Sequence, residues 1–190
     1  MKRQNTRYFT GEEKAKFLRF LEKRRDARRA EMLYKLMFAT GLRLQETVNL
    51  NVGDVQGRDL IAIIGKGDKL REIPLSKAIQ QRIERFLIWK KRKGEGLAPE
   101  APLFISRKKK GRLLKRAVQW DLNRWVRRAG LEGKYSPHAL RHTVGFELMR
   151  KTRNIRQVQE FLGHSSIMTT QIYTHVTKEE LRHCAELLSL

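Results

Sequence analysis

Apolar positions recur along most of this chain with the spacing of amphipathic helices. Thr10 and Glu13 form a capping-box pattern, which predicts a first helix over residues 11–24. A second helix is predicted to end at Gly41, and a third is predicted to begin near Arg43. The same reasoning predicts further helices after Ser76, over Val118–Ala129, from Ser136-Pro137, from Asn154 to Gly163, near Ser166–His175 and near Lys178–Leu188.

One stretch shows the pattern of strands instead of helices. Residues 59–64 and 70–75 are short, mostly apolar runs, and the segment between them contains a lysine flanked by glycines. This pattern predicts an antiparallel hairpin. The expected fold class is therefore mainly α with a small antiparallel β-hairpin. Along the chain we expect a basic N-terminal tail over residues 1–9, a main domain over 10–177 and a C-terminal helix within 178–190.

The charge of the chain limits its possible partners. The 190 residues include 42 lysines and arginines against 20 aspartates and glutamates, which gives a net charge of +22. Such an excess repels itself unless a polyanion relieves it, so nucleic acid is the expected partner. A membrane-surface protein would gather its basic residues on a helix with a bulky apolar face, whereas here they are spread through the chain.

Cysteine content and hydropathy indicate the compartment. Cys184 is the only cysteine, so no disulfide can form within the chain. No apolar run approaches the roughly 20 residues that a membrane-spanning helix needs. The basic start of the chain also lacks the apolar stretch of a signal peptide. We therefore expect a cytoplasmic protein that does not contact a membrane.

Candidate chemistry is concentrated in the C-terminal third of the chain. His138 and Arg141 are three residues apart at a predicted helix N-terminus, where the helix dipole favours an anion. His164 follows the end of a later helix, and Tyr173 comes soon after it. Tyrosine is a poor nucleophile unless cations surround it, so this set suits attack on a phosphodiester. Further upstream, Arg43, Glu46 and Lys66 add two cations and a carboxylate.

Several of these residues also have a plainer interpretation. Arg43 and Glu46 could form an ordinary surface ion pair, and Lys66 could be a solvated lysine in a hairpin turn. His142 is interpreted as a structural residue on a different helix face from His138. A zinc site does not fit the sequence, because two nearby histidines and one distant cysteine give no tetrahedral set of ligands.

The chain has four tyrosines that compete as the nucleophile. Tyr34 lies in an apolar helix and is expected in the core, while Tyr8 lies in the predicted tail. Tyr135 is close to His138 in the sequence, so spacing alone leaves it as an alternative to Tyr173.

Five short strings resemble the motifs of the tyrosine recombinases, the family of phage integrases and Xer proteins. The resemblance covers nearly the whole chain, from about residue 10 to about residue 188. The strings are Thr-Gly-Leu-Arg-Leu-Gln-Glu at 40–46, Gly-Lys-Gly at 65–67 followed by Arg-Glu-Ile-Pro-Leu at 71–75, His-Ala-Leu-Arg-His at 138–142, Leu-Gly-His at 162–164 and Gln-Ile-Tyr-Thr-His at 171–175.

The resemblance implies a fold, a reaction and a role for each matched residue. The fold is the catalytic domain of this family. The reaction is cleavage and rejoining of double-stranded DNA through a 3′-phosphotyrosyl intermediate, without ATP, metal or another cofactor. In the implied roles, Tyr173 is the nucleophile, Arg43 and Arg141 clamp the scissile phosphate, His164 hydrogen-bonds it, Lys66 protonates the leaving 5′ oxygen, His138 assists proton transfer and Glu46 supports the site.

The resemblance also implies partners. Members of the family assemble on DNA, so we expect a monomer off DNA and a tetrameric synapse on it, with residues 178–190 docking on a neighbouring protomer. Family members also carry an N-terminal core-binding domain, which this chain is expected to lack. Two alternatives stay open at this point: DNA relaxation of the type IB topoisomerase kind, and a DNA-binding regulator that uses the same fold without cutting.

Overall fold

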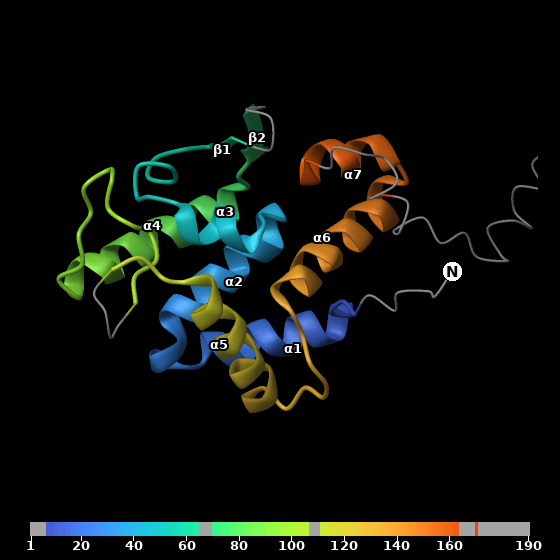
Figure 1. Cartoon of the computed structure of the whole chain (residues 1–190), viewed down its shortest axis with the longest axis horizontal. Coiled ribbons are helices and arrows are strands. Elements are labelled where there is room, and N and C mark those ends of the chain that lie inside the picture. Colours follow the sequence, from blue (N-terminus) through green and yellow to red (C-terminus); the bar gives the residue numbers. More distant parts are fainter. Residues whose placement is uncertain (1–6, 65–69, 107–110, 164–169, 171–190) are drawn as a thin grey trace, which may run out of the picture. The chain divides into compact units, whose positions relative to one another are not determined.

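The computed structural model describes residues 7–64, 70–106, 111–163 and 170. It divides into two compact units, residues 1–144 and 145–190, which are described separately below. The predicted hairpin turn, the last two predicted helices except Thr170, and residues 1–6 lie outside the described residues. Among those described, the elements in chain order (Figure 1) are α1 (Gly11–Glu22), the 3-10 helix η1 (Arg25–Ala27), α2 (Arg28–Thr40), α3 (Leu44–Asn49), β1 (Leu60–Ile64), β2 (Leu70–Pro74), α4 (Lys77–Arg92), α5 (Lys115–Arg128), α6 (Pro137–Thr152) and α7 (Ile155–Leu162). The prediction of a mainly helical fold with one small hairpin is confirmed.

The core of the first unit is built around α2. All residues of α2 from Glu31 to Phe38 are buried, so this helix is covered on every side. Helices α1, α3 and α4 pack against it, and α5 packs against α1 and α3 (Figure 1). A buried cation needs a partner, and Lys35 has two, because its Nζ lies 2.6 Å from Glu31 Oε1 and 2.6 Å from Glu22 Oε1.

Helices begin and end at the residues that the capping patterns predict. Thr10 Oγ1 accepts a hydrogen bond from the Glu13 backbone N–H at 3.2 Å, and Glu13 Oε2 accepts one from the Thr10 N–H at 2.8 Å. Gly41 ends α2 with a φ of 62°, and Gly163 ends α7 with a φ of 64°. Glycine adopts this left-handed conformation without a steric penalty, which is why it is common just after a helix.

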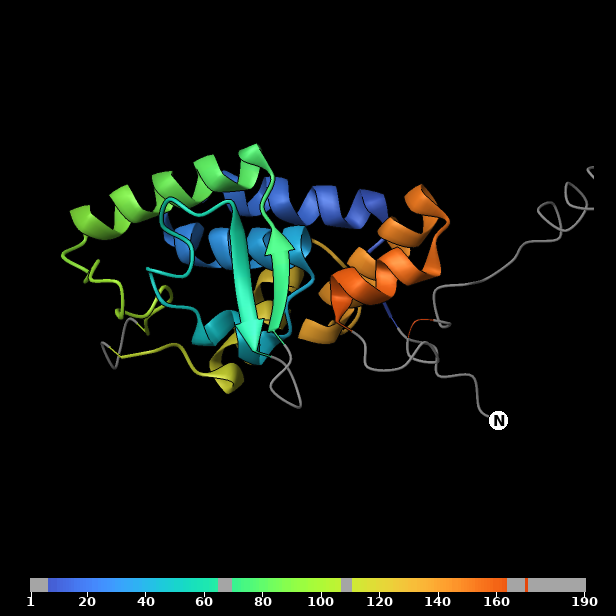
Figure 2. The same cartoon turned by 90° about the horizontal axis from the view of Figure 1, so that it is seen from above.

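The hairpin has one core-facing side and one solvent-facing side. Strands β1 and β2 pair antiparallel, with Ile61 opposite Ile73 (Figure 2). Both isoleucines are buried, whereas Ala62 and Glu72, one position along each strand, are exposed. Side chains alternate between the faces of a strand. Arg71 lies two positions from Ile73 and therefore falls on the core-facing side.

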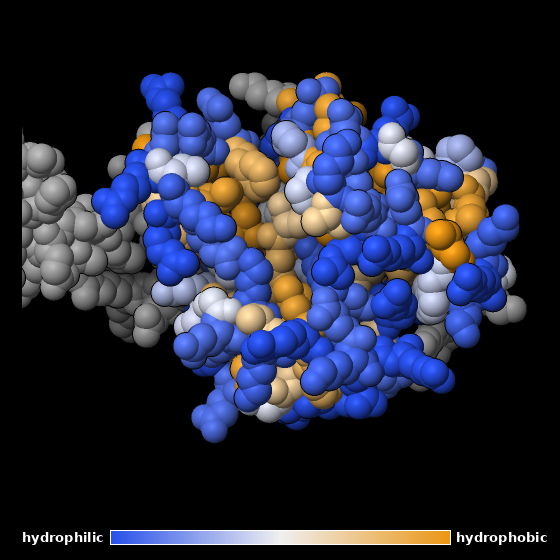
Figure 3. All heavy atoms as spheres, turned by 180° about the vertical axis from the view of Figure 1, so that it is seen from behind, coloured by the Kyte–Doolittle hydropathy of each residue, from blue (hydrophilic) through white to orange (hydrophobic). Residues whose placement is uncertain are grey.

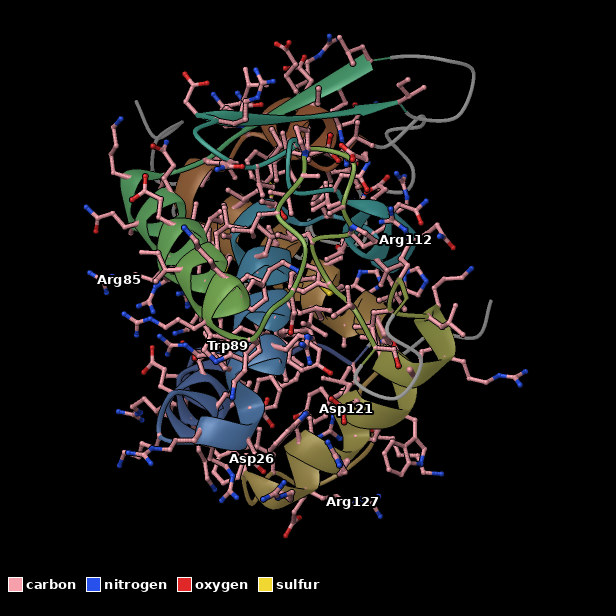
Figure 4. The ribbon with its side chains drawn as sticks, turned by 90° about the vertical axis from the view of Figure 1, so that its left-hand side faces the viewer. Asp26, Arg85, Trp89, Arg112, Asp121 and Arg127 are labelled. Atoms are coloured by element: carbon pink, nitrogen blue, oxygen red, sulfur yellow. The ribbon has the colours of Figure 1, made fainter. Side chains whose placement is uncertain are left out.

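Two cations fix the loop that connects α4 to α5. Helix α4 ends at Arg92, and Lys90 near its end is fully buried. The Lys90 ammonium group donates to Glu95 Oε2 at 3.1 Å and to the Pro102 carbonyl at 3.2 Å, which explains how a lysine is tolerated there. Arg112, labelled in Figure 4, donates to the backbone carbonyl of Asn49 at 2.6 Å, at the C-terminal end of α3. A cation is favoured at that end of a helix.

The second unit contains the end of α6 and all of α7. Arg153 has a φ of 50°, so the chain turns sharply between the two helices. Asn154 then caps α7 as predicted, because its Oδ1 accepts hydrogen bonds from the backbone N–H groups of Arg156 and Gln157 at 3.0 and 3.1 Å.

Hydrophilic side chains cover most of the molecular face that Figure 3 shows. This surface agrees with the large excess of lysine and arginine in the composition. Across the described ranges, no helix is both long enough and apolar enough to cross a membrane.

Residues 7–9 do not form a free tail, so the prediction of a tail over residues 1–9 is wrong for its described part. Phe9 is 1% exposed, and its ring stacks on Tyr135 with 4.0 Å between centroids. The Phe9 backbone N–H donates to Thr143 Oγ1 at 2.8 Å. The basic residues of this stretch suggested a solvated segment, but burial of one aromatic ring outweighs them.

Arg7 also contacts the segment around Tyr135. Its guanidinium lies over the Tyr135 ring, 4.4 Å from the centroid, and donates to the Glu132 carbonyl at 2.6 Å. Gly133 makes this position possible, because a Cβ at residue 133 would lie 2.4 Å from Arg7 Nη1. Gly133 also has a φ of 89°, which other residues rarely adopt.

Replacing Gly133 should therefore destabilise the protein more than replacing a comparable glycine. Gly57 also has a positive φ, of 66°, but a Cβ there would meet no atom within 4 Å. Gly57→Ala should cost about 1–2 kcal/mol of backbone strain. Gly133→Ala should cost more, because it also displaces the Arg7 guanidinium. Urea denaturation measures both losses.

The control for this comparison is the Arg7→Ala background. There the two glycine substitutions should lower the free energy of unfolding by similar amounts, because no guanidinium is left to displace. Equal losses in the wild-type background would show that the contact between Arg7 and Gly133 contributes nothing to stability.

Candidate active site

Arg43 and Glu46 are joined at the start of α3. Arg43 is the N-cap residue of this helix, with extended backbone angles. Glu46 Oε2 accepts a hydrogen bond from the Arg43 backbone N–H at 2.7 Å, and Glu46 Oε1 accepts one from Arg43 Nη1 at 2.8 Å. The Glu46 side chain is 13% exposed and that of Arg43 is 42% exposed. One carboxylate thus holds both the backbone and the guanidinium of Arg43, while the guanidinium stays accessible.

Arg141 reaches the same turn from α6. It is 5% exposed, and its Nη1 donates to the Gly41 carbonyl at 2.7 Å. Gly41 ends α2 and lies two residues before Arg43. Because two residues span at most about 7 Å, this contact brings the Arg141 guanidinium close to the N-terminus of α3. The fold therefore brings together two predicted cations that are far apart in the sequence.

Arg71 is a third arginine at this site, and the sequence interpretation gave it no role. Its Nη2 lies 3.1 Å from Glu46 Oε2, and both side chains are 13% exposed. A signal for this contact is present in the sequence, because Arg71 is in phase with Ile73 on the core-facing side of the hairpin. A cation in such a position needs a partner.

The charge state of Glu46 follows from these contacts. Burial alone would raise the pKa of the Glu46 carboxyl, but hydrogen bonds from Arg43 and the positive charge of Arg71 outweigh burial. The net effect is a pKa below the usual value. Glu46 is therefore ionised near neutral pH and offsets part of the positive charge of the two arginines.

His138 lines a pocket of about 430 Å³ at the N-terminus of α6. His142 lines the same pocket, so the prediction that the two histidines lie on different faces is wrong. Residues four apart on a helix are neighbours. Burial, together with electrostatic repulsion from the neighbouring His138 and Arg141 side chains, lowers the pKa of His142. The other lining residues are Arg7, Asn123, Lys134, Tyr135 and Ser136.

Two of the tyrosines that compete with Tyr173 are buried, which disfavours them as the nucleophile. The Tyr135 hydroxyl donates to Glu13 Oε1 at 2.6 Å, and burial, with the Glu13 carboxylate, raises its pKa. Tyr34 is 1% exposed, and burial raises the pKa of its phenol as well. A buried phenol with a raised pKa supplies little phenolate. The packing of Tyr135 therefore argues against the alternative that the sequence leaves open.

Three predicted site residues, Lys66, His164 and Tyr173, lie outside the described residues. The strands that flank Lys66 are described, as is the helix that ends just before His164. Within the described part of the chain, no three histidine, cysteine, aspartate or glutamate side chains gather as the ligands of a metal ion would.

Sequence comparison with known proteins gives a consistent result. A profile of the phage integrase family matches residues 7–180. The chain is 38% identical over 155 residues to the tyrosine recombinase XerC of Vibrio atlanticus, covering 80% of this chain and 49% of that protein. It is 39% identical over 180 residues to the XerC of Caldanaerobacter subterraneus, covering 92% of this chain and 49% of that protein. The chain thus spans about half the length of these curated relatives.

Solved structures with a similar fold include a recombinase bound to DNA. The pre-cleavage complex of the site-specific recombinase XerH with its difH substrate matches with a TM-score of 0.79 at 29% identity, covering 96% of this chain and 54% of that one. The XerA recombinase matches with a TM-score of 0.78 at 26% identity, covering 96% of this chain and 65% of that one. The catalytic domain of bacteriophage HP1 integrase, at 21% identity and a TM-score of 0.66, shares the fold and covers 97% of this chain and 96% of that one.

The ionised state of Glu46 makes stability depend on pH in a defined way. Because the folded protein lowers the pKa of this carboxyl, its contribution to stability is present above the ordinary pKa of 4.5 and is lost as pH falls through the lower folded value. Glu46→Gln should therefore lower the free energy of unfolding at pH 7 by roughly 1–2 kcal/mol. The difference from wild type should shrink steadily below pH 4.5, as urea titrations at several pH values would show. A difference that is the same at pH 7 and pH 3 would contradict this account.

Proposed function

Because the chain belongs to the phage integrase family, we propose that it is the catalytic domain of a site-specific recombinase that cleaves and rejoins double-stranded DNA. The named relatives are tyrosine recombinases, and XerH was solved on its DNA substrate. The net charge of +22 supports a polyanionic substrate independently of those relatives.

The observation that carries the proposal is the hydrogen bond from Arg141 to the Gly41 carbonyl. It draws a guanidinium from α6 to the turn that presents Arg43. Two arginines converging on one place suit a phosphate whose non-bridging oxygens gain charge as the phosphorus becomes pentacoordinate. The Arg43 side chain is the more accessible of the two and is held by Glu46.

In the proposed reaction, the Tyr173 oxygen attacks the scissile phosphorus and the bond from phosphorus to the 5′ oxygen breaks. The product is a 3′-phosphotyrosyl linkage and a free 5′ hydroxyl. Because one phosphodiester replaces another, the strand can be rejoined by the reverse attack of a 5′ hydroxyl without an external energy source. Arg43 and Arg141 stabilise the transition state more than the bound substrate, which is what accelerates the step.

Two proton transfers accompany this exchange in the proposal. The phenol of Tyr173 loses its proton as it attacks, and His138 assists that transfer. The leaving 5′ oxygen gains a proton from Lys66, since an alkoxide leaves poorly. His164 donates a hydrogen bond to a phosphate oxygen. His138 is exposed at the pocket it shares with His142, so it is accessible to a substrate.

The proposal extends to assembly. A recombinase must bring two DNA sites together, so we propose a tetramer on DNA and a monomer off it, with residues 178–190 docking on a neighbouring protomer. The chain spans about half the length of these relatives, so the proposal for this chain is cleavage and rejoining of a strand, with assembly tested separately.

Tyr173→Phe should keep DNA binding and abolish formation of a covalent adduct. The measurement is gel analysis of protein trapped on a suicide substrate that carries the native target site. A loss of at least about 10³-fold is expected, as for other nucleophiles that act as part of a catalytic set. Tyr8→Phe is the matched control, since Tyr8 is 41% exposed and should leave adduct formation unchanged.

An adduct that persists in Tyr173→Phe would assign the nucleophile to another residue. A wild-type protein that binds the target but never forms an adduct would favour the regulator alternative over the recombinase.

Lys66 can be tested by changing the leaving group. A thiol has a pKa near 8.5, so a sulfur at the 5′ bridging position leaves without a proton donor. Lys66→Ala should cleave ordinary DNA about 10²-fold or more slowly than wild type. It should cleave the 5′-phosphorothiolate substrate nearly as fast as wild type. Arg141→Ala should show no such rescue, because its role is on the non-bridging oxygens.

If sulfur does not rescue Lys66→Ala, this lysine contacts the phosphate or the DNA groove instead. Lys69 and His138 would then be the next candidates for the acid.

A further inference from the structure

Arg71 occupies an unusual position for a cation in so basic a protein. Its side chain is only 13% exposed, whereas that of Arg43, which shares the same carboxylate partner, is 42% exposed. The Arg43 guanidinium is the more accessible of the two, while Arg71 lies on the core-facing side of the hairpin.

The carboxylate of Glu46 divides its two oxygens between these arginines. Oε1 accepts a hydrogen bond from Arg43 Nη1 at 2.8 Å. Oε2 accepts one from the Arg43 backbone N–H at 2.7 Å and one from Arg71 Nη2 at 3.1 Å. Two of these three hydrogen bonds come from Arg43 itself. The third comes from Arg71 and connects the Glu46 carboxylate to strand β2.

We infer that Arg71 is a positioning residue for Arg43 and acts through the carboxylate of Glu46. This inference rests on the proposed function, in which Arg43 contacts the scissile phosphate. Arg71 fixes the plane of the carboxylate, and the carboxylate fixes the Arg43 guanidinium. Through this chain of contacts, strand β2 and the N-terminus of α3 hold one another in place.

The energetic reasoning supports a positioning role. Arg71 Nη2 lies 3.1 Å from Glu46 Oε2, and a largely buried carboxylate that loses such a cation is destabilised. Positioning also has a large effect on rate, since a displacement of about 1 Å in a catalytic group can slow a reaction about 10²-fold. Removing Arg71 takes away the hydrogen bond that Glu46 receives from strand β2 and lets the carboxylate shift together with the Arg43 guanidinium.

The test is a double-mutant cycle with Arg43. Single-turnover rates of adduct formation are measured on the suicide substrate for wild type, Arg71→Ala, Arg43→Ala and the double variant, with DNA affinities measured separately. Arg71→Ala should slow adduct formation roughly tenfold or more. In the Arg43→Ala background, the added Arg71→Ala substitution should slow adduct formation by less than about twofold, because Arg43, through which Arg71 acts, is gone. If the fold-reduction in rate for the double variant equals the product of the fold-reductions for the two single variants, the inference is wrong.

Lys77→Ala is the matched control for charge. Lys77 is exposed at the start of α4, and its replacement removes one positive charge without touching Glu46. It should leave the rate of adduct formation unchanged. DNA affinity should fall by a similar factor in Lys77→Ala and Arg71→Ala. A tenfold greater loss of affinity in Arg71→Ala would mean that Arg71 binds DNA directly, and the inference would be wrong.

A second variant keeps the test decisive if Arg71→Ala does not fold, as judged by circular dichroism and thermal unfolding. Arg71→Lys retains a cation but not the guanidinium geometry, so it should fold and recover part of the lost rate. Glu46→Gln should slow adduct formation as much as Arg71→Ala. A Glu46→Gln variant that reacts at the wild-type rate would overturn the inference, because the proposed connection runs through that carboxylate.

The outcomes also separate this inference from the proposed function. If wild-type protein forms no adduct on its target, the proposed function fails and the role of Arg71 in cleavage fails with it. If wild type forms the adduct and the effects of Arg71→Ala and Arg43→Ala multiply, only the role of Arg71 is rejected.

Discussion

The hydrogen bond between Arg141 and the Gly41 carbonyl is the contact on which the proposed site depends. A guanidinium that is 5% exposed must find an acceptor, and the left-handed glycine at the end of α2 supplies one. The contact joins the helix that carries His138 to the turn that carries Arg43. The site therefore exists only when the first unit is folded, since none of its local segments brings these groups together alone.

In this protein, which has a net charge of +22, several cationic side chains are buried and need partners of opposite charge. Carboxylates lie beside them, as Lys35 with Glu31, Lys90 with Glu95 and Arg71 with Glu46 show. Each such pair of one cation and one carboxylate is neutral, so the excess of positive charge stays on the rest of the molecule, where it favours binding of a polyanion.

Local chemistry made much of this fold predictable. Thr10 and Asn154 set helix starts through hydrogen bonds to residues two or three positions away, so their effect can be identified in the sequence. The position of Arg141 against Gly41 depends on residues 100 positions apart, and no local pattern encodes it. Phe9 is predicted to lie in a solvated tail because its partners, Tyr135 and Thr143, are distant in the sequence. The error for His142 has another cause. Residues four apart on a helix are neighbours, so its spacing from His138 already indicates that both histidines lie on one face of α6.

The contacts of Arg7 and Phe9 determine which part of the fold would bear a pulling force applied at the N-terminal side. The sequence suggests that the unit begins at Thr10, with the cap of α1. The contacts of Phe9 with Tyr135 and Thr143 instead attach the chain to the segment just before α6 and to α6 itself, ahead of α1. Tension on any polypeptide joined ahead of Arg7 would therefore be borne first by the helix that presents His138 and Arg141. In such a fusion, a boundary drawn at Thr10 would remove Phe9 from the core.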